Sequence, residues 1–113
     1  MEIAERETGS VTVLDLSGKI TLGDGDTLLK DKLHSLLHRG KKNVLLNLSN
    51  VSYVDSAGLG ALVSAYTTVT REGGSLKLAN ITRKLQDLLS ITKLLTVFET
   101  FDSEDEAIRS YKI

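Results

Sequence analysis

Residues 44–62, Val-Leu-Leu-Asn-Leu-Ser-Asn-Val-Ser-Tyr-Val-Asp-Ser-Ala-Gly-Leu-Gly-Ala-Leu, decide the fold of this chain. The apolar run at residues 44–48 is typical of a central strand buried on both faces, and the amphipathic run at residues 61–71 predicts a helix. Asp55 and Ser56 lie between them, where the strand leads into a helix N-terminus. Free backbone N–H groups at such a terminus attract anions. Ser56 is therefore a candidate helix cap, nucleophile or phosphate acceptor.

Strand and helix patterns alternate on both sides of this stretch. Residues 3–7 and 11–16 predict two strands paired as a hairpin, and a helix over residues 27–39 should be capped by Asp24 or Asp26. Further along the chain, the patterns predict a strand at 76–79, a helix marked by Leu85, Leu88 and Leu89, a strand within 95–101, and a terminal helix opened by a Ser103–Glu106 capping box.

The resulting order, β-β-α-β-α-β-α-β-α, predicts an α/β fold. Alternating strands and helices give a sheet with parallel central strands and right-handed crossovers, and the initial hairpin makes this open sheet mixed. The 113 residues suit a single domain spanning 1–113. In open sheets of this kind, functional sites gather beyond the carboxyl ends of the strands. Asp55 and Ser56 follow the end of their strand and fit this rule.

Composition excludes several classes of function. The 14 basic and 15 acidic residues give a net charge of −1, without the basic excess expected of a nucleic-acid-binding protein. There is no Cys, which excludes a disulfide or a thiolate nucleophile. No apolar run approaches the roughly 20 residues needed to span a bilayer, so no direct membrane insertion is expected. The charged N-terminus is no signal peptide, and a cytoplasmic protein is predicted.

Enzyme and metal signatures are incomplete. A hydrolase nucleophile elbow has a glycine two residues before its serine, where this chain has Val54. The only histidines, His34 and His38, lie four residues apart on the first predicted helix without a following acid, which favours two solvated side chains over a metal site or a catalytic base. Residues 23–26 imitate half of a phosphate loop but lack its later glycine and lysine. We therefore expect no enzyme activity, no metal and no cofactor.

Residues 46–62 resemble the signature of STAS domains, most closely the free-standing anti-sigma factor antagonists. Residues 16–20, 73–80, 94–98 and 102–107 resemble other parts of the same family, so that the likeness covers nearly the whole chain. The Asp-Ser-Ala-Gly-Leu-Gly core at residues 55–60 is quite specific to it.

The resemblance implies a partner-switching mechanism in signal transduction and transcription regulation. The unphosphorylated antagonist binds an anti-sigma factor serine-protein kinase and frees the sigma factor. The kinase then uses ATP to phosphorylate the antagonist, and the phosphorylated antagonist dissociates from the kinase. A serine phosphatase restores binding. The acceptor position corresponds to Ser56, which would make this chain a phosphoprotein. The supporting motif comprises Asp55, Ala57, Gly58, Leu59 and Gly60.

Contiguity with the acceptor suggests where a partner binds. Gly58 should lie on the packed side of its helix, and Gly60 on the outer side, where a kinase can approach. The remaining candidates for partner contact are Gly18, Gly23, Gly25 and Ser64.

Two alternatives remain open within the same family. A bare STAS domain can be a scaffold subunit of a stress-signalling complex, or a subunit of a lipid ABC-transport complex that need not be phosphorylated. For the antagonist itself, we expect a monomer or weak dimer.

Overall fold

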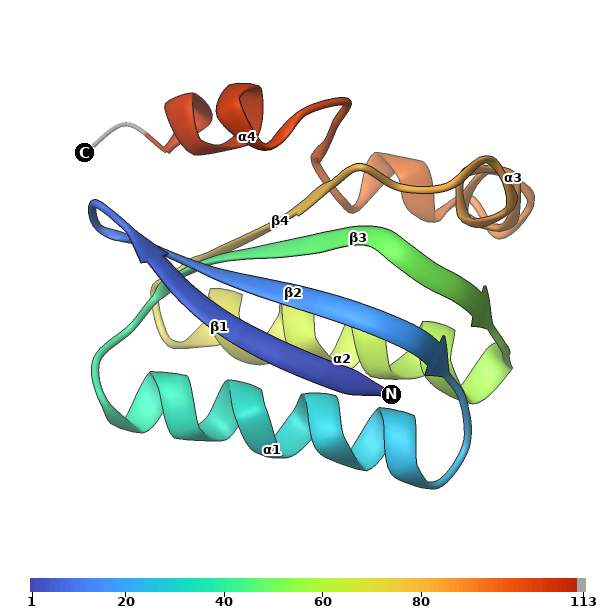
Figure 1. Ribbon diagram of the computed structural model, residues 1–113, viewed down its shortest axis with the longest axis horizontal. Coiled ribbons are helices and arrows are strands. Elements are labelled where there is room, and N and C mark those ends of the chain that lie inside the picture. Colours follow the sequence, from blue (N-terminus) through green and yellow to red (C-terminus); the bar gives the residue numbers. More distant parts are fainter. Residues whose placement is uncertain (112–113) are drawn as a thin grey trace.

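A five-stranded sheet in the order β1-β2-β3-β4-β5 organises the chain (Figure 1). The computed structural model describes residues 1–111, apart from the side chain of Asp24. The first two strands pair antiparallel and the others pair parallel, which confirms the predicted mixed sheet. The strands are β1 (Glu2–Thr8), β2 (Val11–Ile20), β3 (Asn43–Val54), β4 (Ser75–Ala79) and β5 (Thr100–Phe101).

Helices cover both faces of this sheet. Two long helices run side by side below it in Figure 1, and the last helix lies above it. The helices are α1 (Asp24–His38), α2 (Ser56–Arg71), α3 (Arg83–Ile91) and α4 (Glu104–Ser110), with a short 3-10 turn, η1, at Leu94–Thr96. The alternation of strands and helices follows the order predicted from the sequence.

Two hydrophobic cores result, one on each face of the sheet. In β3, Leu46 and Leu48 belong to the larger core with α1, α2 and α3, whereas Leu45 belongs to a smaller core closed by Ala107 and Tyr111. Residues 44–48 of β3 contribute side chains to both cores, which explains why this part of the strand is almost continuously apolar. The predicted central strand is confirmed.

The start of the first helix was predicted wrongly. α1 begins at Asp24 and not near residue 27, and Gly23 is its N-cap, without any side-chain capping bond. Gly23 has φ 98°, a conformation that favours glycine and lets the chain turn directly into the helix. Asp26 lies inside the first turn, where its carboxylate accepts from the N–H of Thr27 at 2.7 Å.

The C-terminal elements agree with the sequence more closely. The predicted Ser103 cap is confirmed, since its hydroxyl accepts from the N–H of Glu106 at 3.2 Å. The predicted last strand is present but has only two residues. The preceding chain forms η1 instead, after Lys93 takes a left-handed conformation with φ 63°.

Candidate functional site

The carboxyl ends of β2 and β3 place two loops next to each other. Ile20 and Val54, the last residues of these strands, are register partners. The N–H of Asp55 then donates to the carbonyl of Ile20 at 3.3 Å. The turn that enters α2 is therefore fixed against the loop that enters α1. Both lie beyond the carboxyl ends of the strands, where a site was predicted.

We call the junction between the loop that enters α1 and the turn that enters α2 the corner. The side chain of Asp55 connects its two parts. One of its carboxylate oxygens accepts from the N–H of Gly58 at 2.7 Å, which caps α2, and the other accepts from the N–H of Leu22 at 3.1 Å. These backbone donors, Gly58 first and Leu22 second, lower the pKa of Asp55. One carboxylate thus fixes both the start of the helix and the neighbouring loop.

Ser56 is left free by this arrangement. Because Asp55 is the cap, the alternative in which Ser56 caps α2 is wrong, and Ser56 is instead the first helical residue. Its side chain is exposed. Within residues 1–111, no side-chain hydrogen bond of Ser56 is found, and neither histidine bonds to it. A phosphate here would meet the positive end of the helix dipole, and it would also lie next to the carboxylate of the N-cap residue Asp55.

The two glycines of the motif have opposite surroundings. A Cβ atom on Gly58 would lie 1.9 Å from the carbonyl oxygen of Ile20, whereas a Cβ on Gly60 would meet nothing within 4 Å. Gly58 is buried and Gly60 is exposed. The prediction that Gly58 packs against the sheet while Gly60 faces outward is confirmed.

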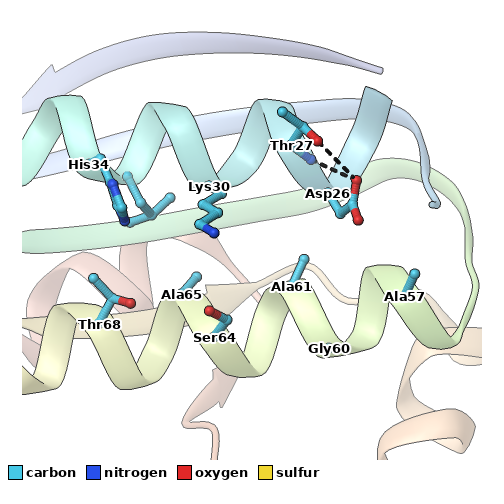
Figure 2. Close-up of a pocket in the computed structure, with 11 residues that line it drawn as sticks. Asp26, Thr27, Lys30, His34, Ala57, Gly60, Ala61, Ser64, Ala65 and Thr68 are labelled. Carbon is cyan, nitrogen blue, oxygen red and sulfur yellow. Dashed lines mark hydrogen bonds between the residues drawn. The ribbon is translucent and has the colours of Figure 1, made fainter. Parts of the chain in front are cut away.

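A groove of about 280 Å³ runs between α1 and α2 from this corner. Figure 2 shows its two walls, with Lys30 and His34 on α1 opposite Ala57, Gly60, Ser64 and Thr68 on α2. The structure therefore brings Gly60 and Ser64 together along one surface. The sequence analysis did not identify Lys30 and Thr68 as part of a site. The only signal for them was that each lies one helical turn from another residue of the groove on its own helix.

The other three glycines named from the sequence have different surroundings. Gly18 lies in β2 with φ 100°, and its carbonyl accepts from the hydroxyl of Ser52 at 3.2 Å. Gly23 is exposed at the start of α1. Gly25 is buried, and a Cβ there would lie 2.9 Å from the carbonyl oxygen of Lys19. Gly25 therefore shapes the loop by packing and does not present a surface to a partner.

Among residues 1–111, no cluster of three potential metal ligands is present. His34 and His38 are exposed on α1, as predicted for solvated side chains. No helix in this part of the chain is both long and apolar enough to cross a membrane.

Comparison with known protein families identifies a match, in which the model of the STAS domain aligns with residues 2–107. The chain belongs to the STAS domain family. An anti-sigma-B factor antagonist of Listeria monocytogenes is 32% identical over 108 residues, covering 94% of this chain and 91% of the relative. An anti-sigma F factor antagonist of Paenibacillus polymyxa is 21% identical over 113 residues, covering 100% of this chain and 97% of the relative.

A solved STAS-like structure shows the same fold. The Bacillus cell fate determinant SpoIIAA in its phosphorylated form superposes with a TM-score of 0.76 at 18% identity, covering 98% of this chain and 100% of SpoIIAA. The mixed sheet with its helices is therefore the STAS fold.

Proposed function

We propose that this protein is an anti-sigma factor antagonist controlled by phosphorylation of Ser56. In this proposal, the unphosphorylated form binds an anti-sigma serine-protein kinase and releases a sigma factor. Phosphorylation of Ser56 ends that binding, and a serine phosphatase reverses it. The protein is then a substrate of enzymes and not itself one, and it acts in the cytoplasm as a monomer or weak dimer.

The observation that carries the proposal is the free hydroxyl of Ser56. It is exposed at the first position of α2, and the capping role that would occupy a serine there is taken by Asp55. The names of the relatives support the proposed partner, since they are antagonists of anti-sigma factors. SpoIIAA, which shares the fold, has been solved in phosphorylated and unphosphorylated forms.

The helix N-terminus explains why modification need not disturb the fold. A phosphate adds about −1.5 to −2 charges at neutral pH, and the helix dipole favours such a charge by roughly 0.3–1 kcal/mol. Asp55 opposes it by like-charge repulsion at the preceding position. With these effects opposed, we expect phosphorylated protein to remain folded.

Phosphorylation should abolish partner binding through its effect on the interface, and not through a change in the fold. A surface that accommodates a neutral hydroxyl must bury or repel the added dianion. A hundredfold loss of affinity corresponds to only about 2.7 kcal/mol, and an uncompensated charge at an interface can cost that much. Ser56 therefore acts as a switch without any rearrangement of α2.

Leu22 extends the proposed partner surface. It is 76% exposed, although large apolar side chains are usually buried. Its backbone N–H is bound to Asp55, which fixes this apolar side chain at the same corner as Ser56. We expect Leu22 to be an apolar anchor for the kinase, and Leu22→Ala to weaken binding while leaving the fold intact.

The decisive experiment is phosphoryl transfer from ATP by a cognate anti-sigma kinase, measured by intact mass and site mapping. Ser56→Ala is the test variant, and Ser90→Ala, which removes an exposed hydroxyl on α3, is the control. We expect one phosphoryl group on wild type and on Ser90→Ala, and none on Ser56→Ala. Absence of transfer to wild type by an active kinase would contradict the proposal and favour a scaffold or transport-complex subunit.

A further inference from the structure

The groove between α1 and α2 has chemistry that the proposed phosphorylation switch does not use. Its floor is apolar and includes the buried side chains of Leu33 and Ala65. Its volume of about 280 Å³ is near the lower limit for small-molecule sites. A floor of this kind favours a ligand with a small apolar body.

Polar groups from both helices converge above this floor. Lys30 and His34 point from α1 toward α2, and the hydroxyls of Ser64 and Thr68 lie on the opposite wall (Figure 2). In the described part of the chain, no ion pair or side-chain hydrogen bond engages any of these four side chains. An ammonium group and an imidazole facing two hydroxyls present several hydrogen-bond donors to one anionic group.

We infer that this groove is a binding site for a small organic monoanion, such as a carboxylate on a compact apolar body. The anionic group would lie between Lys30 and His34 on one side and Ser64 and Thr68 on the other. The apolar body would cover Leu33 and Ala65. The inference needs no kinase and stands independently of the proposed function.

The opposite end of the groove limits the ligand to one anionic group. Asp26 lines the groove beside Ala57, and its carboxylate accepts from the N–H of Thr27. A second anionic group on the ligand would approach this carboxylate and be repelled. Benzoate should therefore bind more tightly than terephthalate, which carries a carboxylate at each end of the same ring.

The test is titration of the 15N-labelled protein with benzoate, followed by two-dimensional NMR. Benzamide, which has the same shape without the charge, is the matched control ligand. We expect benzoate to shift the amide signals of Lys30, His34, Ser64 and Thr68 in a saturable way, with a Kd on the order of millimolar for a ligand of this size. Benzamide should cause no saturable shift at the same concentrations.

Variants separate a specific site from general charge attraction. Lys30→Met keeps most of the side-chain length but removes the charge, and it should weaken benzoate binding by about fivefold to tenfold. Lys84→Met, which removes an exposed lysine on α3, should leave it unchanged. Equal shifts with benzamide, equal losses in both variants, or no saturable shift with benzoate would each overturn the inference.

Discussion

Substituting Gly58 by alanine should damage the corner that presents Ser56. The added Cβ would lie 1.9 Å from the carbonyl oxygen of Ile20 and 2.7 Å from its carbonyl carbon. The first distance is roughly 1.5 Å shorter than van der Waals contact permits. Both atoms belong to the backbone of β2, so no side-chain rotation can relieve the clash.

The magnitude follows from two opposing effects. Alanine is favoured over glycine within a helix by about 1 kcal/mol. Overpacking against a rigid neighbour costs about 1–3 kcal/mol and occasionally more, and a contact this short with backbone belongs at the upper end. We expect a net destabilisation of about 2 kcal/mol, which lowers Tm by about 8 °C in a domain of this size.

Gly60→Ala is the matched control, because it makes the same chemical change in the same helix. Apart from the neighbouring backbone of α2 itself, no atom lies within 4 Å of its added Cβ, so only the gain in helix propensity remains. We expect Gly60→Ala to be more stable than wild type by up to about 1 kcal/mol. If Gly60 also faces the kinase, this more stable variant should bind its partner less tightly.

Urea unfolding followed by circular dichroism at 222 nm measures both variants on one scale. The reasoning is refuted if Gly58→Ala is as stable as Gly60→Ala, since the two would then share one environment. Isothermal titration calorimetry with the kinase measures whether Gly60→Ala binds its partner less tightly. Unchanged kinase affinity in Gly60→Ala would leave Gly60 as a requirement of the turn alone.

Three further perturbations test other parts of the structure. Ser56→Asp should retain the helical circular dichroism of wild type while losing kinase binding, and a large loss of helical signal would refute an effect confined to the interface. Tyr111→Phe removes the buried hydroxyl that donates to the carbonyl of Val44, and urea unfolding should show a loss of about 1 kcal/mol; an unchanged midpoint would show that this bond contributes no net stability. Hydrogen bonding to Arg39 is the main reason that the pKa of Glu5 falls to about 2. Its contribution is therefore complete above pH 4.5 and lost as the pH falls toward 2. Glu5→Gln should be less stable than wild type at pH 7 by less than about 1 kcal/mol, and in thermal unfolding curves the difference should shrink as the pH falls from 4.5 and vanish below pH 2.

The central sheet could be predicted from the sequence because burial leaves a direct pattern. The apolar run of residues 44–48 reports a strand covered on both faces, and this is where the structure places the two cores. The helix cap at Ser103 was equally readable, since Ser103 and the Glu106 N–H that it accepts from lie three residues apart. Both features could be read from residues that lie close together in the sequence.

The start of α1 could not be predicted because a distant contact decides it. The loop before it is fixed by Asp55, which accepts from the N–H of Leu22 across 33 positions of sequence. Gly23 then turns the chain into the helix without a side-chain cap. A capping rule based on neighbouring residues favoured Asp24 or Asp26, and it had no access to this contact. The groove was missed for the same reason, since its two walls come from different helices.

The order of Asp55 and Ser56 explains how one short segment can be both rigid and open to modification. A serine at the cap position of α2 would use its hydroxyl to accept from the N–H of Gly58, as Asp55 does now, and that oxygen would be tied to the helix. With aspartate as the cap, the structural bond is made one residue earlier, and Ser56 keeps an exposed hydroxyl on a backbone that is already fixed. The second oxygen of Asp55 fixes Leu22 at the same time. A partner would then meet a preorganised surface on which only the charge of residue 56 changes, and preorganisation of this kind lowers the entropic cost of binding.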